Sequence, residues 1–211
     1  METHTFTKKE EVVNAITHGF GVLLSIAALS LLVVFASMSG DAIDIVSVTI
    51  YGLTMVFLYT SSTLVHAFPP GKWKDRFEIL DHAAIYLFIA GTYTPIALIL
   101  LRGPLGWSLF GLVWFIAIAG VIFKMFFVKK FVVLSTIMYI MMGWIIVFAW
   151  NPLVAQIALG GVVLLIIGGL LYSFGSIFYV WRGFRFHHAV WHLFVIGGSV
   201  MHFLAIFFYV L

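Results

Sequence analysis

The residues best suited to chemistry in this chain are three histidines, His66, His188 and His192, which lie in long apolar stretches. His188 and His192 are four positions apart, so on a helix they project from one face, one turn apart. A buried polar cluster in such surroundings costs several kcal/mol unless a partner satisfies it. A zinc ion with these imidazole ligands and an open position for water would satisfy the cluster and form a catalytic site. The sequence therefore predicts a zinc site.

Asp81 is a candidate catalytic residue beside this site, because an ionisable residue inside an apolar span suggests a function. It can act as a base that accepts a hydrogen bond from zinc-bound water. Its structural alternative is a place in the first turn of a helix, where negative charge is stabilised. The other acidic residues are expected in tails or loops: Glu2, Glu10, Glu11, Asp41, Asp44, Asp75 and Glu78.

Ser62, one turn before His66, is the second candidate catalytic residue. Its hydroxyl can orient that imidazole or donate to a developing oxyanion, and an interhelical hydrogen bond is an equal alternative. Zinc is favoured over magnesium and calcium, which prefer more oxygen ligands than this layer offers. A non-haem iron site would take Asp81 as a direct ligand, and this alternative stays open.

Three further histidines have open roles. His202 falls on the same helical face as His188 and His192, but it lies roughly 15 Å beyond His192 at about 1.5 Å per residue and cannot bind the same ion. We expect a structural hydrogen bond or a substrate contact there. The roles of His18 and His82 are undecided between structure and function.

The elements that must position these residues are membrane helices. The chain is 64% hydrophobic and 9% charged, which excludes an ordinary soluble domain. A membrane helix needs roughly 20 mostly apolar residues, and continuous rather than alternating apolar runs exclude a β-barrel. We predict an all-α membrane protein, a seven-transmembrane helix bundle forming a single domain over residues 1–211. The expected spans are about 17–38, 43–67, 80–101, 105–127, 131–150, 153–180 and 187–211.

The basic residues predict the topology. All of them except Arg102 fall at alternate ends of the spans, so the N-terminus is expected in the cytoplasm and the C-terminus on the extracytoplasmic side. This orientation brings Ser62, His66, Asp81 and the His188–His192 pair to one layer near the cytoplasmic face. No basic stripe exists outside the membrane, which excludes nucleic acid as a partner.

Three motifs carry a family resemblance. The segments Ser62-Thr-Leu-Val-His66, Leu80-Asp81-His82 and His188-Ala-Val-Trp-His192 resemble the hemolysin III family, the bacterial branch of the progestin and adipoQ receptors, which is related to alkaline ceramidases. The segments 10–19, 90–95 and 168–175 are similar to bacterial members as well. The resemblance covers nearly the whole chain.

The resemblance implies zinc held by His66, His188 and His192 near the cytoplasmic side, with Asp81 contacting zinc through water and Ser62 supporting the site. It also implies a multi-pass protein of the bacterial inner membrane, a role in membrane-lipid homeostasis, and a membrane lipid as candidate substrate. It specifies neither the lipid nor an oligomeric state.

Three functions follow as alternatives. The first is a zinc-dependent intramembrane hydrolase of lipid amide or ester bonds, in which Asp81→Asn keeps the metal but abolishes turnover. The second is a non-catalytic sensor or receptor, whose zinc only joins helices; a fourth protein ligand such as Asp81 would favour this alternative. The third is a cytolysin. The argument against it is that no ring of charges spans the predicted bundle.

Overall fold

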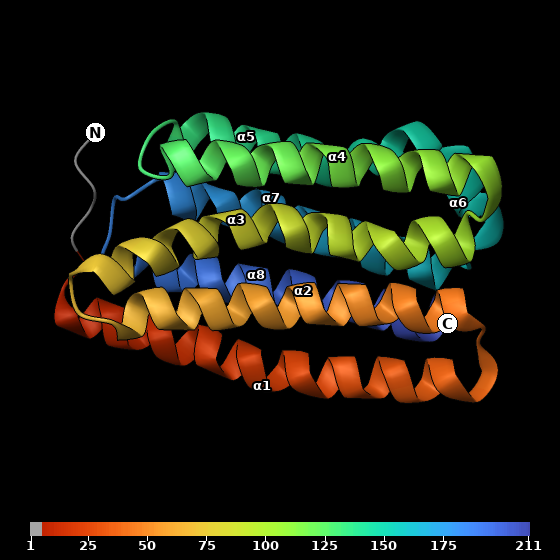
Figure 1. Ribbon diagram of the computed structural model, residues 1–211, viewed down its shortest axis with the longest axis horizontal. Coiled ribbons are helices and arrows are strands. Elements are labelled where there is room, and N and C mark those ends of the chain that lie inside the picture. The colour runs from red at the N-terminus through yellow and green to blue at the C-terminus, as the bar shows by residue number, and fades with distance from the viewer. Residues whose placement is uncertain (1–5) are drawn as a thin grey trace.

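The computed structural model describes residues 6–211, which form helices and contain no strand (Figure 1). Glu2 lies outside the described residues. The helices are α1 (Lys8–Ser39), α2 (Ala42–Ala67), α3 (Lys72–Pro95), η1 (Ile96–Leu100), α4 (Gly103–Phe127), α5 (Val132–Gly143), η2 (Ile145–Ala149), α6 (Trp150–Gln156), α7 (Leu159–Val180) and α8 (His187–Tyr209). They make seven spans that are long and apolar enough to cross a membrane, so the predicted seven-helix class is confirmed.

Two spans begin earlier than predicted. The first starts at Lys8 rather than near 17, because Thr7 and Glu10 form a capping box that begins the helix before the apolar run. The third starts at Lys72 rather than near 80, directly after Gly71, whose φ of 152° turns the chain.

These early starts correct the placement of the acidic residues. Five of the residues expected in tails or loops lie inside helices: Glu10, Glu11, Asp44, Asp75 and Glu78. Asp44 belongs to a second capping box, for which Asp41 is the N-cap of α2. Asp81 is therefore not the single acidic residue within the spans, and acidic side chains reach the interior from α1 as well.

The fifth span is a broken helix that the sequence did not predict. The expected span 131–150 continues to Gln156, but it is interrupted after Gly143 by Trp144 and the 3-10 turn η2. The Tyr93 hydroxyl donates to the Gly143 carbonyl at 2.8 Å and accepts from the Ile146 N–H at 2.9 Å. This one side chain satisfies backbone groups that would otherwise be unpaired in an apolar environment.

The sixth span begins at Leu159 rather than near 153, because Pro152 lies in the first turn of α6, where proline is tolerated, and α6 continues the fifth span to Gln156. Pro95 has a related effect in the third span, where the α-helix gives way to the π-helical turn η1. Proline lacks the N–H that the regular helix would need at this point.

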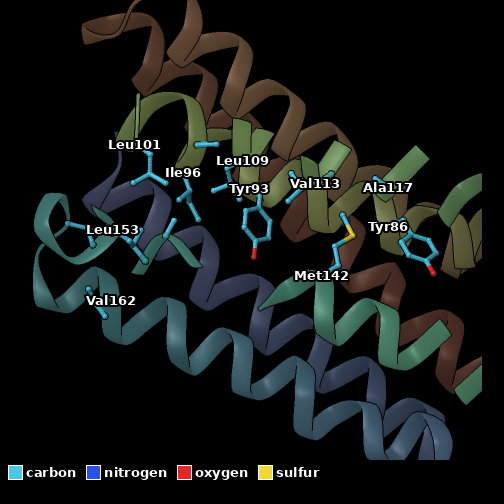
Figure 2. Close-up of a cluster of buried hydrophobic side chains, with 14 residues drawn as sticks. Tyr86, Tyr93, Ile96, Leu101, Leu109, Val113, Ala117, Met142, Leu153 and Val162 are labelled. Carbon is cyan, nitrogen blue, oxygen red and sulfur yellow. The ribbon is translucent and has the colours of Figure 1, made fainter. Parts of the chain in front are cut away.

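The bundle has two apolar cores. One joins α3 to α7 and contains Tyr93, Val113 and Met142, as Figure 2 shows. The other joins α1, α2, α3 and α8 and contains Leu32, Tyr59 and several neighbours. The start of α1 and the end of α8 lie at opposite ends of the bundle (Figure 1). At the end where α1 begins, the N-terminal end of the bundle, α3 and α8 also begin and α2 ends. The polar residues near these helix ends therefore lie at one level.

Candidate metal centre

His66, His188 and His192 form a compact group at this end of the bundle. Each offers one ring nitrogen, and the three atoms lie within 4.8 Å of one another. His66 comes from the last turn of α2, whereas His188 and His192 come from the first two turns of α8. The His188 and His192 rings are 4.6 Å apart between centroids. Three histidine nitrogens are the kind of donor set that binds zinc.

A carboxylate on α1 fixes the orientation of His66. Nδ1 of His66 lies 2.7 Å from Oε2 of Glu11. A carboxylate oxygen accepts, so Nδ1 carries the proton and Nε2 presents its lone pair. This Nε2 is buried and has no hydrogen-bond partner among the described residues. A metal ion is a partner that suits a lone pair in this position, so the residues present fit a zinc ion.

A hydroxyl on α1 does the same for His192. Nδ1 of His192 lies 3.1 Å from Oγ1 of Thr17. The Thr17 hydroxyl has a single proton, which it donates to the backbone carbonyls of Val13 and Asn14 at 3.0 and 2.9 Å. It therefore accepts from Nδ1–H, and Nε2 of His192 is left with its lone pair. Two of the three imidazoles thus present the same nitrogen.

His18 lies against the group of three histidines without belonging to it. Its ring stacks on His192 with 3.5 Å between centroids and an angle of 11°, and its edge meets Tyr59. It lines the cavity described below and is buried, with neither ring nitrogen hydrogen-bonded in the described part of the chain. His18 therefore packs against the face of the His192 ring.

One face of α1 forms the back of the site. Glu11, Asn14 and His18 are spaced by three and four residues, and Thr17 is three after Asn14, so they share a helix face. Sequence reasoning missed Glu11 and Thr17. The spacing of Glu11, Asn14 and His18 is visible in the sequence. It indicates a shared helix face only when the helix begins before Glu11, whereas the expected span began near residue 17.

Asp81 and Ser62 reach the same site through a cavity. A cavity of about 130 Å³ is lined by Ser62, Asp81, His188 and His192. The Asp81 carboxylate is not in the three-nitrogen group found among the described residues; its Oδ2 lies 3.6 Å from Nδ1 of His82. The structure thus brings all five predicted site residues to one end of the bundle and leaves Asp81 outside the group of three histidine nitrogens.

The other histidines take different positions. His82 bridges α3 and α7, with Nδ1 2.8 Å from the Glu78 carbonyl and Nε2 3.0 Å from the Tyr179 hydroxyl. His202 lines the deep part of the cavity, and its Nε2 donates to the Leu165 carbonyl at 3.1 Å. His202 therefore makes a structural hydrogen bond and faces the space that a bound molecule would occupy.

Comparison with known proteins places the chain in a family. Residues 6–203 match the family model described as "Haemolysin-III related". The chain is 54% identical over 204 residues to the Hemolysin-3 homolog of Bacillus subtilis, covering 97% of this chain and 96% of that protein. It is also 54% identical to Hemolysin-3 of Bacillus cereus, over 96% of this chain and 93% of that protein.

A mammalian relative extends the comparison. The human Monocyte to macrophage differentiation factor is 30% identical over 212 residues, covering 95% of this chain and 84% of that protein. The match with the family model spans the helices that supply all the site residues, from α1 to α8. The chain is an integral membrane protein with seven apolar helical spans, and it belongs to the haemolysin-III related family.

Proposed function

We propose that this protein is a zinc-dependent hydrolase that cleaves lipid amide or ester bonds within the membrane. The observation that carries the proposal is the group of three histidine nitrogens within 4.8 Å of one another, two of whose residues line a cavity with Asp81 and Ser62. Three neutral imidazoles and an open fourth position are typical of catalytic zinc. A structural site would instead be closed by a fourth protein ligand.

His66, His188 and His192 would hold the zinc. When bound, zinc lowers the pKa of a coordinated water to about 7 and polarises a carbonyl oxygen. Hydrolysis then needs a base and a donor from the protein. The carboxylate of Asp81 lines the cavity but stands apart from the ligand group, which suits a base that takes a proton from water. Ser62 is placed one turn before His66, where its hydroxyl can donate to the carbonyl oxygen.

The cavity supports a lipid substrate. Besides His188 and His192 it is lined by Ile89, Trp144, Gly169 and His202 and by other mostly apolar side chains, which suit a hydrocarbon chain. The reacting amide or ester would then lie at the polar end, and the hydrocarbon chain would extend toward the middle of the bundle. This arrangement is consistent with the role in membrane-lipid homeostasis that the family resemblance implies.

The membrane placement is part of the same proposal. The N-terminal end of the bundle carries the basic residues Lys72, Lys74 and Lys129 together with the histidine site. By the positive-inside rule this end faces the cytoplasm. In a bacterium the chain would then reside in the inner membrane as one domain, with its active site open to lipids of the inner leaflet.

The test is turnover of a lipid amide by purified protein, with Asp81→Asn as the informative variant. We expect Asp81→Asn to retain zinc and to lose about 10²- to 10⁴-fold in turnover, the usual contribution of a general base. Turnover unchanged in Asp81→Asn would remove this residue from the mechanism. Zinc without turnover of any lipid amide or ester by the wild type would favour the non-catalytic sensor.

The names of two relatives favour one alternative, a cytolysin. Leakage of vesicles that contain no hydrolysable amide or ester lipid would support a direct effect on membranes. Leakage that requires a hydrolysable lipid and is lost in Asp81→Asn would instead make lysis a consequence of hydrolysis.

A further inference from the structure

Glu11 joins the metal-binding group to the α2–α3 connection. Its Oε2 accepts from Nδ1 of His66 at 2.7 Å, and its Oε1 accepts from Nζ of Lys74 at 2.9 Å. Lys74 donates in addition to the Val65 carbonyl at 2.6 Å, in the last turn of α2. One carboxylate therefore connects α1, the end of α2 and the start of α3 around a single imidazole.

We propose that Glu11 is a positioning residue of the metal centre, which holds His66 with its proton on Nδ1 and its Nε2 lone pair directed into the histidine group. Lys74 in turn holds and neutralises the carboxylate. This inference rests on the proposed zinc site but adds a residue that takes no part in ligation or in proton transfer.

The physical reason is that an isolated imidazole can place its proton on either nitrogen and can rotate about its terminal torsion. A charged acceptor at Nδ1 selects one tautomer and one ring orientation, and it also raises the basicity of the opposite nitrogen. The site is well shielded, since the side chains of His66 and Glu11 are 5% and 20% exposed. Water therefore competes weakly for the Nδ1–H.

The neighbouring Glu10 has different hydrogen-bond partners, so the positioning role is specific to Glu11. Its carboxylate accepts from the Thr7 backbone at 2.9 Å and the Thr7 hydroxyl at 2.7 Å, and from the Phe186 N–H at 3.3 Å. These contacts cap α1 and hold the segment before α8. Glu10 makes no hydrogen bond to an imidazole among the described residues, so the two adjacent glutamates are not interchangeable.

The experiment measures zinc affinity by competition with a chromophoric chelator for the wild type, Glu11→Gln and Asp75→Asn in detergent. Asp75→Asn is the matched control, because it removes a surface ion pair to Lys129 of the same 2.9 Å length at the same end of the bundle. We expect Glu11→Gln to weaken zinc binding about 10- to 100-fold, the usual cost of removing such an outer partner. Asp75→Asn should bind zinc as the wild type does.

A second measurement separates positioning from folding. Nitrogen-15 spectra of the zinc-free protein report which nitrogen of His66 is protonated. The wild type should show the proton on Nδ1, and Glu11→Gln should show a mixture at an unchanged melting temperature of the zinc-free protein.

Equal zinc affinity in the wild type and Glu11→Gln would overturn the inference while leaving the zinc site intact. A melting temperature that falls in the zinc-free variant while its tautomer stays unchanged would also overturn it, since Glu11 would then be merely structural. A wild type that binds no zinc would overturn the proposed function first.

Discussion

The two sides of the cavity are built differently. On the side of α1, α2 and α8, two imidazoles are fixed through their outer nitrogens, His66 by Glu11 at 2.7 Å and His192 by Thr17 at 3.1 Å. On the side of α3 and α7, the Asp81 carboxylate is 3.6 Å from His82, beyond a short hydrogen bond. The first side is arranged to hold atoms in place. The second leaves a carboxylate with room to accept a proton.

Under the proposed function, this difference places metal binding and proton transfer on separate helices. A ligand set needs fixed tautomers and ring orientations, which the buried face of α1 supplies. A base needs access to the reacting water and the freedom to change its hydrogen bonds. Changes on the two sides should therefore have separable effects.

The largest expected effect is on the ligand side. His192→Ala removes one of three ligands, so zinc affinity should fall by more than the about 100-fold upper range of outer-partner changes. His202→Ala is the control, because His202 lines the same cavity but hydrogen-bonds to Leu165 instead. Competition titration with a chelator measures both. Tight zinc binding in His192→Ala would contradict the division between the two sides.

A second change tests whether the helix break after Gly143, in the core formed by α3 to α7, is independent of the histidine group. Tyr93→Phe leaves the Gly143 carbonyl and the Ile146 N–H without their partner at the helix break. Unpaired buried groups of this kind cost about 1–3 kcal/mol in the free energy of unfolding. Denaturant unfolding in detergent measures the loss, and zinc affinity should be unchanged.

The control for this change is Tyr86→Phe, because within residues 6–211 the Tyr86 hydroxyl hydrogen-bonds only to the Met138 sulfur, at 3.8 Å. It should cost less than Tyr93→Phe. Equal losses in the two variants would show that the break does not depend on Tyr93. A fall in zinc affinity in Tyr93→Phe would show that the two halves are coupled.

The smallest expected effect sharpens the comparison within the ligand side. Thr17→Val removes a neutral acceptor from His192, so zinc affinity should fall by about 10-fold, the lower end of the range for outer partners, and by less than in Glu11→Gln. Thr49→Val is the matched control, since its hydroxyl donates to Ile45 within its own helix. A larger loss in Thr17→Val than in Glu11→Gln would reverse the proposed ranking of the two partners.

Much of the fold followed from the sequence, because continuous apolar runs identify membrane helices directly. The positions where prediction failed have local causes. The start of α1 at Lys8 depends on the Thr7–Glu10 capping box, which extends a helix beyond its apolar run. The helix break after Gly143 contains no proline that would have predicted it, and it is stabilised by Tyr93 from another helix.

The site was predictable to the extent that it rests on spacing. The four-residue interval places His188 and His192 on one face, and alternating helix directions bring Ser62, His66 and Asp81 to the same level. The supporting residues Glu11 and Thr17 were not predicted, because their contacts join distant parts of the chain. Glu11 and His66 are 55 positions apart, and Thr17 and His192 are 175 apart, so only the packing of α1 reveals these pairs.

The most direct test of the central claim is the zinc content of detergent-purified protein, measured by elemental mass spectrometry in the wild type and His188→Ala, both purified without chelators. A three-histidine centre predicts close to one zinc per chain in the wild type and its loss in His188→Ala, with Asp81→Asn retaining the metal. A wild type without zinc, or a His188→Ala variant with as much zinc as the wild type, would contradict the claim.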